Sequence, residues 1–405
     1  MKIIQINGNS FRGSTGKIVW TISSDLKERG IENLIICSGF NENKSLPDVR
    51  YVSNKIRKRI HQILAYIFGD AGFHSGFVTK KVIGIIEQEK PDIVHLHHLE
   101  SYFINIERLV KYLKEKHVTT VWTLHDCWPF TGHCTHFLTA NCDKWKTQCE
   151  KCPQKKKYPY SLIFDRSKKL YSLKKELLED WEELHIVNVS KWMDSITRES
   201  FLSKHPTEVI YNGIDVSAFS PSDTDCKSEL GFAGKRVVLG VASSWGESKG
   251  LDYFIELSKA VDENTVIVLV GMDKDRIKKL PAGVIGVLRT SSKEELRKYY
   301  CAADVFLNLS LEETMGLVTV EALACGTPVI VCNSSASPEL VGDGCGIVLE
   351  ERTVPGIVDA ISEIVSHGKA FYGENARSFV LNNFAEDIMK KNYYDLYCKI
   401  GKENE

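Results

Sequence analysis

The sequence predicts an α/β protein built from two consecutive, doubly wound parallel sheets. Short apolar runs alternate with amphipathic stretches along the 405 residues, and this alternation restarts near the middle of the chain. Turn-forming residues gather between the two halves, at residues 205–223. Strands that alternate with helices in this way form parallel βαβ units, which build Rossmann-like domains. We therefore expect two such domains that face a cleft, with the ligand site at the carboxyl ends of their strands.

The first domain is expected to span residues 1–205. Its predicted strands are the short apolar runs at residues 3–6, 33–37, 93–96, 120–124 and 185–189. Its clearest helical patterns lie between those runs, at residues 17–27, 78–89 and 106–116. Residues 127–160 interrupt the alternation and carry little helix or strand signal, so we interpret them as an insertion.

The second domain is expected to span residues 206–384 and to repeat the pattern. Its predicted strands are at residues 237–241, 265–270, 283–287, 305–308, 328–331 and 347–349. Its predicted helices are at residues 249–261, 293–299, 316–324 and 355–366. The tail, residues 385–405, carries a helical pattern and is grouped with the first domain.

Charge and composition exclude several classes of protein. Lys and Arg number 52 and Asp and Glu number 53, and this net charge of −1 argues against a broad electrostatic grip on nucleic acid. No apolar run approaches the roughly 18 residues that a membrane-spanning helix needs. The apolar stretch in residues 1–8 is far too short for the core of a signal peptide. We therefore expect a cytoplasmic protein with reduced thiols and no nucleic-acid partner.

The most informative motif covers residues 312–330, where Glu313, Gly316 and Glu321 lie in an acidic loop and the helix that follows it. Glycine lets the backbone approach a ligand closely, and a helix N-terminus offers N–H groups and a positive dipole end to a phosphate. The two carboxylates can accept hydrogen bonds from sugar hydroxyls on either side of that phosphate. A solvated loop acid and an ordinary helix-surface glutamate are the alternative interpretation of the acid pair alone.

The motif resembles the Glu-x7-Glu signature of the GT-B, family 4 retaining glycosyltransferases, with Glu313 and Glu321 as the two acids. Further matches follow in the family's order along nearly the whole chain, at residues 13–16, 123–126, 211–215 and 249–252. The resemblance implies the GT-B fold, in which a C-terminal helix, here in residues 385–405, crosses back to the N-terminal domain. It also implies a retaining transfer of a sugar from a UDP- or GDP-linked donor.

The resemblance assigns roles to individual residues. The catalytic residues are Glu313, which contacts hydroxyls of the transferred sugar, and His125, which lies beside that sugar. Glu321 binds the ribose of the nucleotide. The residues that the family has near the phosphates are Gly16, Lys249, Met315, Gly316 and Leu317, of which Gly16 is near either the phosphates or the acceptor. Because a lysine and backbone N–H groups can stabilise the leaving diphosphate, no catalytic metal is expected.

One position departs from the family's pattern. An arginine often stands five residues before the lysine, and Ser244 takes that position here. A hydroxyl group cannot supply the bidentate contact that a guanidinium makes with phosphate. Either Lys249 and the helix N-terminus suffice, or another cation such as Arg289 substitutes.

Four cysteines cluster in the insertion: Cys134, Cys142, Cys149 and Cys152, spaced Cys-x7-Cys-x6-Cys-x2-Cys. The last pair has the chelating spacing of structural zinc sites, and four thiolates complete a tetrahedron. His133 and His136 are alternative ligands. We expect a structural zinc ion, with buried free thiols or a disulfide as the alternatives. The Cys-rich insertion resembles the colanic-acid and capsule branch of the family, which assembles bacterial polysaccharides.

Two segments combine basic and apolar residues in a way that is typical of contact with an anionic membrane surface. Residues 55–68 begin with basic side chains and continue with apolar ones, and residues 155–160 add a basic-aromatic run. An amphipathic helix packed into the core is the alternative for residues 55–68. Because acceptors in such pathways are usually lipid-linked, we expect a lipid-linked or oligosaccharide acceptor and peripheral attachment to the inner face of the plasma membrane.

Two other functions are open at this point. Another GT-B enzyme, such as a sugar-nucleotide epimerase, is disfavoured by the spaced acid pair and by residues 211–215. A non-catalytic, zinc-bearing GT-B scaffold is favoured only by Ser244, and the presence of His125, Lys249, Glu313 and Glu321 opposes it.

Overall fold

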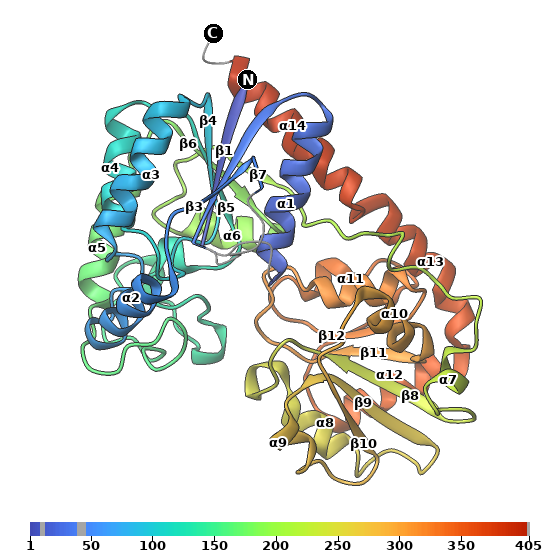
Figure 1. Ribbon diagram of the computed structural model, residues 1–405. Helices are drawn as coiled ribbons and strands as arrows, with labels where there is room; N and C mark the ends of the chain where they lie inside the picture. The colour runs from blue at the N-terminus through green and yellow to red at the C-terminus, as the bar shows by residue number, and fades with distance from the viewer. Residues whose placement is uncertain (9–12, 39–45, 403–405) are drawn as a thin grey trace. The chain divides into compact units, whose positions relative to one another are not determined.

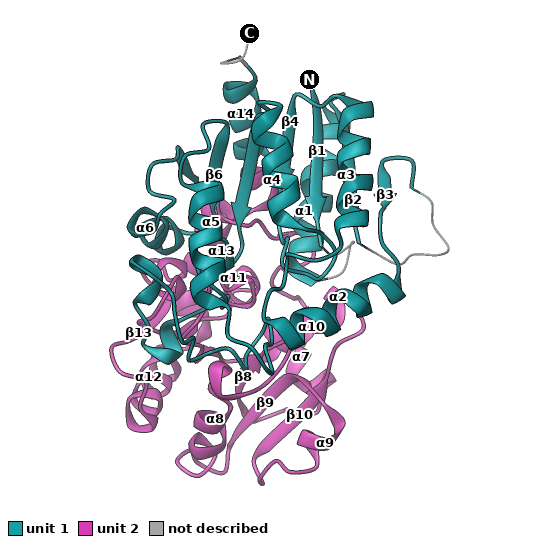
Figure 2. Cartoon of the chain, turned by 90° about the vertical axis from the view of Figure 1, so that its left-hand side faces the viewer, with its two compact units in different colours: residues 1–210, 390–405 teal, residues 211–389 magenta. Residues whose placement is uncertain are grey.

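The computed structural model describes residues 1–8, 13–38 and 46–402 (Figure 1). The chain forms two compact units (Figure 2). Unit 1 comprises residues 1–210 and the chain from residue 390 onward, and unit 2 comprises residues 211–389. Residues 207–210 belong with unit 1 because β7 (Thr207–Val209) pairs with β6 (Leu184–Asn188) at the edge of the first sheet.

Unit 1 has, within its described residues, a parallel sheet of seven strands in the order β3-β2-β1-β4-β5-β6-β7. Besides β6 and β7, the strands are β1 (Lys2–Asn7), β2 (Glu32–Cys37), β3 (Val49–Tyr51), β4 (Ile93–Leu96) and β5 (Thr120–Leu124). The direction in which strands are added reverses between β1 and β4, and open α/β sheets bind ligands at such a point. Every residue of β4 and β5 is buried, which explains why short apolar runs predicted them.

The helices that connect these strands are α1 (Gly13–Glu28), α2 (Lys55–Phe68), α3 (Gly76–Glu89), α4 (Ile106–Glu115), α5 (Ser167–Leu178) and α6 (Lys191–Glu199). The insertion between β5 and α5 contains short 3-10 turns, at η1 (Trp128–Phe130), η2 (Leu138–Ala140) and η3 (Lys144–Lys146). Its lack of regular helices and strands agrees with its lack of hydrophobic periodicity.

Unit 2 has a parallel sheet in which six described strands follow the order β10-β9-β8-β11-β12-β13. The strands are β8 (Arg236–Val241), β9 (Thr265–Met272), β10 (Val284–Leu288), β11 (Val305–Asn308), β12 (Val329–Cys332) and β13 (Gly346–Leu349). The strand order reverses between β8 and β11, so the carboxyl ends of these two strands form the expected ligand position.

The α-helices of unit 2 are α7 (Cys226–Glu229), α8 (Leu251–Leu257), α9 (Lys274–Ile277), α10 (Lys293–Ala302), α11 (Leu317–Ala324), α12 (Val354–His367) and α13 (Lys369–Asn383). Two 3-10 turns, η4 (Glu247–Lys249) and η5 (Ser337–Leu340), lie close to strand ends. The prediction of two parallel-sheet, Rossmann-like domains is confirmed.

The last helix, α14 (Glu386–Lys402), belongs to unit 1 from Lys390 onward. There the Tyr397 hydroxyl lies 2.6 Å from Nδ1 of His95, and the Tyr393 hydroxyl lies 3.0 Å from the Thr123 hydroxyl. The helix therefore packs against β4 and β5. Residues 403–405 of the predicted tail lie outside the described residues.

Two details of the fold differ from expectation or extend it. The edge strands β3 and β7 were not predicted, because each has three residues and so shows no measurable alternation. None of the described helices has both the length and the apolar composition that a bilayer-spanning helix requires.

Candidate active site

Lys249 lies in a tight turn after β8, the first strand of unit 2. Gly250, which separates η4 from α8, has a φ of +72°, and a Cβ there would lie 2.7 Å from Cβ of Leu309. Only glycine fits this turn against the end of β11. The predicted helix at residues 249–261 is therefore too long, because the left-handed Gly250 separates Lys249 from a helix that spans Leu251–Leu257.

An ion pair joins Lys249 to Glu313. Nζ of Lys249 donates to Oε1 of Glu313 at 2.5 Å and lies 3.5 Å from Oγ of Ser310. The two side chains are 31% and 13% exposed, so water reaches the pair only in part. The backbone N–H of Glu313 donates to Oγ of Ser335 at 2.9 Å, and its carbonyl accepts from the N–H of Ala336 at 3.1 Å. These contacts fix the acidic loop beside the lysine at the β8–β11 reversal point.

Helix α11 begins directly after this loop. Gly316 precedes its first residue, Leu317, and has a φ of +83°, and a Cβ at Gly316 would lie 3.2 Å from Cδ1 of Leu340. The N–H groups at the start of an α-helix lack intrahelical acceptors and carry the positive end of its dipole. Met315 is buried, and its sulfur accepts the backbone N–H of Asn212 at 3.0 Å. The Met315 side chain is therefore an anchor, and its backbone is the part suited to a ligand.

Glu321 lies further along α11 and is half-buried. The hydroxyl of Tyr300 donates to Oε2 of Glu321 at 2.8 Å. Burial, together with the Glu321 carboxylate, raises the pKa of Tyr300 well above its usual range, so Tyr300 keeps its proton at neutral pH. This hydrogen bond orients the carboxylate for which the family resemblance implies a contact with the ribose.

His125 lies at the carboxyl end of β5 in unit 1, in a row of imidazoles that continues onto β4. Nε2 of His125 lies 3.1 Å from Nδ1 of His97, and Nε2 of His97 lies 3.3 Å from Oε1 of Gln5. Burial, and after it the neighbouring histidines, hold the pKa values of His125 and His97 well below their usual range. His125 is therefore neutral at physiological pH, and its imidazole can donate or accept a hydrogen bond with a ligand without carrying a charge.

A second cluster, which we call the His98 network, adjoins this row and consists of His98, Glu100 and Asp126. Nδ1 of His98 lies 3.3 Å from Oε1 of Glu100, and Nε2 of His98 lies 3.2 Å from Oδ2 of Asp126. Burial alone would lower the pKa of His98, but the Glu100 carboxylate and the hydrogen bond to Asp126 raise it to about 9. The His98 network therefore ties the loop after β4 to the loop after β5 through a charged imidazole.

The remaining predicted site residues lie at several places. Gly16 is buried near the start of α1 in unit 1. Ser244 is exposed on the loop after β8, so the site has a hydroxyl at the position where the family often has an arginine. Arg289 is exposed directly after β10, the edge strand, and β9 separates that strand from β8. Lys249, Glu313 and Gly316 are thus the predicted residues that unit 2 brings together.

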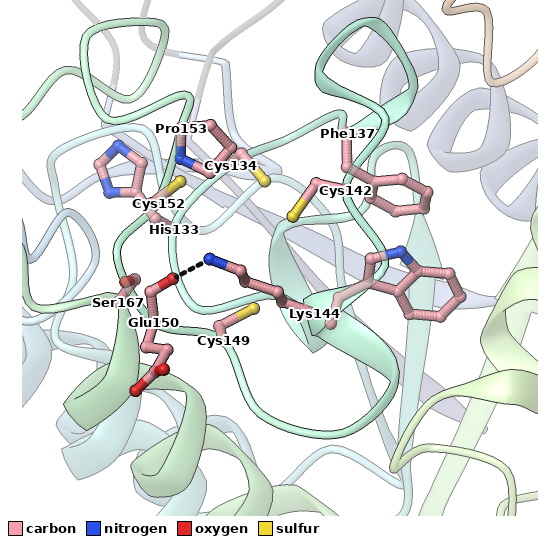
Figure 3. A pocket seen from close by; sticks show the side chains of 11 residues that line it. His133, Cys134, Phe137, Cys142, Lys144, Cys149, Glu150, Cys152, Pro153 and Ser167 are labelled. Atoms are coloured by element: carbon pink, nitrogen blue, oxygen red, sulfur yellow. Dashed lines mark hydrogen bonds between the residues drawn. The ribbon is translucent and has the colours of Figure 1, made fainter.

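The four predicted zinc ligands, Cys134, Cys142, Cys149 and Cys152, line one small cavity in unit 1 (Figure 3). His133 also lines this cavity. His136, the other alternative ligand, does not line the cavity.

Sequence reasoning missed the partners that hold the predicted residues. In unit 2 these are Ser310, Tyr300 and Ser335, ordinary polar residues that no motif distinguishes. In unit 1 they are His97 and the His98 network. A signal for the latter was present, because polar residues follow the predicted strand at residues 93–96, and the carboxyl ends of neighbouring parallel strands meet at one edge of a sheet.

Comparison with known protein families identifies the chain. A model described as Glycosyltransferase Family 4 matches residues 15–218, half of the chain. A second model, described as Glycosyl transferases group 1, matches residues 235–367. The chain belongs to glycosyltransferase family 4. The two matches cover residues 15–16 of the glycine segment, His125 and the acid-pair motif of this glycosyltransferase.

Relatives of this glycosyltransferase cover most of its length. It is 27% identical over 299 residues to the Escherichia coli K12 protein named as the colanic acid biosynthesis glycosyl transferase WcaC, with 71% of each chain covered. It is 22% identical to the N-acetyl-alpha-D-glucosaminyl L-malate synthase of Bacillus anthracis, with 97% of this chain and 95% of that protein covered.

Solved structures share its fold. The sucrose-phosphate synthase of Thermosynechococcus elongatus superposes with a TM-score of 0.73 at 17% identity and 98% coverage of both chains. Anabaena HepE, whose structure is titled as a complex with UDP and glucose, superposes with a TM-score of 0.69 at 17% identity, covering 98% of this chain and all of HepE. The fold of this glycosyltransferase is GT-B.

Proposed function

We propose that this glycosyltransferase transfers a sugar, with retention of anomeric configuration, from a nucleotide-sugar donor to a lipid-linked saccharide acceptor in bacterial surface polysaccharide synthesis. The observation that carries the proposal is the Lys249–Glu313 pair at the start of α11, where an ammonium, a carboxylate and helix N–H groups lie together. The name of the E. coli relative, a colanic acid biosynthesis glycosyl transferase, supports the pathway.

Unit 2 is the proposed donor site. A diphosphate would accept hydrogen bonds from the Lys249 ammonium, which has three N–H donors, and from the N–H groups of Gly316 and Leu317 at the N-terminus of α11. Glu313 would then accept hydrogen bonds from hydroxyls of the sugar, and Glu321 from those of the ribose. HepE, the GT-B protein whose structures are titled with UDP and UDP-glucose, supports a UDP-linked donor. A Corynebacterium glutamicum relative named as GDP-mannose-dependent, 28% identical over half of this chain, supports a GDP-linked one.

The reaction needs few groups. The bond between the anomeric carbon and the diphosphate oxygen breaks, a bond to the acceptor oxygen forms, and the acceptor proton passes to the leaving diphosphate. Negative charge that grows on the diphosphate is stabilised by Lys249 and the helix N–H groups. Neutral His125 orients a hydroxyl of the transferred sugar. No step in this scheme requires a metal ion.

Unit 1 carries a basic and apolar surface that suits an anionic membrane. Ile56, Ile60 and Ile63 of α2 are 71%, 53% and 48% exposed, so the apolar side of this helix is not packed into the core. Three further apolar residues, Leu162 to Phe164, are also exposed. They lie beside the end of α2, where the N–H of Leu162 donates to the Tyr66 carbonyl at 2.7 Å. We call these six residues the α2 patch.

Basic residues flank the α2 patch on both of its segments. Lys55, Arg57 and Arg59 are exposed at the start of α2, and Lys156 and Lys157 are exposed shortly before Leu162. Apolar side chains that enter the headgroup region next to cations that attract anionic lipid are the features of a peripheral membrane helix. This surface supports a lipid-linked acceptor and attachment to an anionic membrane.

The test of the donor and the reaction is direct. Purified enzyme is incubated with a panel of UDP- and GDP-sugars, with and without a lipid extract as acceptor, and release of the nucleoside diphosphate is measured. We expect release from one or a few donors, stimulated by acceptor, with the α-anomer of the donor giving an α-linked product. Absence of release from every donor contradicts the proposed donor site, and a β-linked product from an α-donor contradicts retention.

The test of the membrane surface is separate. Binding to phosphatidylglycerol-containing vesicles and to phosphatidylcholine vesicles is compared by co-sedimentation. We expect binding to the anionic vesicles alone, weakened at high salt and lost in an Ile60→Ser/Leu162→Ser variant. Ile285→Ser/Leu288→Ser, which removes apolar residues of similar exposure from unit 2, is the matched control. Equal binding by both variants contradicts the assignment to the α2 patch.

A further inference from the structure

The insertion between β5 and α5 buries large side chains without regular secondary structure. Its described elements are the 3-10 turns η1, η2 and η3. Trp145 stacks on Phe137 with ring centroids 4.7 Å apart, and both are buried. A segment of this length without helices or strands needs another source of order. Its set of cysteines offers a further source of order beside this aromatic packing.

Four of those cysteines surround one cavity. Cys134, Cys142, Cys149 and Cys152 line a cavity of about 10 Å³, and Figure 3 shows their side chains around its wall. A space of this size holds about one small atom and excludes an organic ligand. Cys134, Cys142 and the Cys149–Cys152 pair come from three separate places in the insertion, so a single bound ion would join all three.

We propose that Cys134, Cys142, Cys149 and Cys152 bind one structural zinc ion as four thiolates. Cys149 and Cys152 have the Cys-x2-Cys spacing that lets one turn supply two ligands. With Zn–S bonds of about 2.3 Å, the sulfur atoms of a tetrahedral site lie about 3.8 Å apart. Among the residues described, the three or more ligand atoms that lie within 4.8 Å of one another are those of the His98 network, so the four sulfur atoms are not yet that close together. Binding of zinc would require the cysteine side chains to move toward the centre of the cavity.

The surroundings of the cysteines suit thiolate ligands. The backbone N–H of Gly132 donates to Sγ of Cys149 at 3.2 Å. A Cβ at Gly132 would lie 2.2 Å from the carbonyl oxygen of Ser167, so only glycine lets this N–H reach the sulfur. The N–H of Cys152 donates to the Asp165 carboxylate at 2.7 Å, which fixes the second chelating residue. Hydrogen bonds of this kind orient metal ligands.

A lysine lies in the cavity wall and would offset part of the charge of a zinc–thiolate site. Four thiolates and one Zn²⁺ carry a net charge of −2, and Lys144 lines the cavity, where its Nζ donates to the carbonyl of Glu150 at 3.0 Å (Figure 3). A disulfide would instead join two of the cysteines directly, without an ion between them. Cys134 and Cys152 are the pair that would form it, because the interaction between their thiols raises the pKa of Cys134.

The zinc site would support the loop that carries His125. Cys127 follows Asp126, and its N–H donates to the Thr135 carbonyl at 2.9 Å, next to Cys134. The buried Lys174 of α5 donates to the carbonyls of Trp128 and Thr131 at 2.6 and 2.9 Å. The ordered insertion is thereby connected on one side to the His98 network and on the other side to α5.

The decisive experiment measures metal on the full-length protein, purified without a metal-affinity step. We expect about one zinc ion per chain by elemental mass spectrometry, and at least a fivefold loss in Cys142→Ser/Cys152→Ser. Cys398→Ser is the matched control, because Cys398 is also half-buried but lies in α14, and this variant should keep its zinc. Replacement of zinc by cobalt should give the charge-transfer absorption of four thiolate ligands.

The measurement also separates the alternatives. A wild-type protein that contains no metal, and whose four cavity cysteines all react as free thiols, contradicts the site. A Cys134–Cys152 disulfide found by mass spectrometry under non-reducing conditions also contradicts it. Loss of zinc or a three-thiolate cobalt spectrum in His133→Ala contradicts the four-thiolate ligand set. If the double variant does not fold, zinc content and cobalt spectrum of the wild-type protein still decide the question.

Discussion

The carboxyl edges of the two sheets carry different chemistry. In unit 1, β4 and β5 end in imidazoles, of which His97 is buried and His125 half-buried, and desolvation holds the pKa values of both well below their usual range. In unit 2, β8 and β11 end beside a partly exposed ion pair, Lys249 and Glu313, next to a helix N-terminus. Neutral hydrogen-bonding groups suit hydroxyls, whereas an ammonium and helix N–H groups suit phosphates. On the proposed function, unit 2 would meet the charge of the diphosphate and the neutral imidazoles of unit 1 would meet hydroxyls of the sugar.

The largest expected effects on turnover come from removing the Glu313 carboxylate of unit 2 or the His125 imidazole of unit 1. Glu313→Ala and His125→Ala should each lower turnover by about 10²- to 10³-fold, because each removes a contact that we propose with the transferred sugar in the transition state. Circular dichroism should show that both variants fold. Steady-state kinetics with the donor identified by the panel provide the measurement.

Matched controls are available in each unit. Glu256→Ala removes an exposed carboxylate that pairs with Lys259 in unit 2, and His117→Ala removes an imidazole of unit 1 whose side chain is 80% exposed. Both should leave turnover within about twofold. Near-normal turnover of both Glu313→Ala and His125→Ala would sink the site assignment.

A smaller effect is expected from the backbone at the phosphate position. Gly316→Ala forces a left-handed residue with a Cβ 3.2 Å from Leu340, which costs about 1 kcal/mol or more and displaces the first N–H groups of α11. We expect the donor KM to rise about tenfold. Gly283→Ala is the control, because Gly283 has the same φ of +83° with nothing within 4 Å of an added Cβ. If both variants raise KM equally, strain rather than phosphate contact explains the effect.

The charged imidazole of unit 1 predicts a pH dependence of stability. The pKa of His98 is about 9 in the folded protein, above its usual value of 6.5. The folded state therefore binds the proton more tightly, and this contribution is full below about pH 6.5 and is lost as the pH rises through about 9. Relative to His98→Gln, the wild-type protein should lose on the order of 1 to 3 kcal/mol of unfolding free energy over that interval. Urea unfolding at several pH values measures the difference, and parallel curves for both proteins would show that His98 does not titrate in this interval.

Much of the fold follows from the sequence, and less of the site does. Strands such as β4 and β5 are buried on both faces, so uniform apolar runs identify them. The Lys249–Glu313 pair depends on β8 lying next to β11, an order that local patterns do not specify. The His98 network has the same cause, since His98 and Asp126 meet only because β4 pairs with β5. Gly250 interrupts the predicted helix in a left-handed conformation, and the close approach of Leu309, which is distant in sequence, leaves no room for a side chain there.

The smallest effect concerns the cation that replaces the family's arginine. Arg289 follows β10, which is two strands from β8 and so about 10 Å away across the sheet, near the Debye length at physiological salt. Because Arg289 is also exposed, its interaction with a phosphate held at Lys249 is screened. Arg289→Ala should therefore change the donor KM by less than about twofold, while Lys249→Ala should raise it at least tenfold. A tenfold rise in Arg289→Ala would show that unit 2 recruits a second cation after all. A small effect would mean that Lys249 and the N-terminus of α11 alone stabilise the diphosphate charge. In that case Ser244→Arg should lower the donor KM, because it adds the guanidinium that the site lacks.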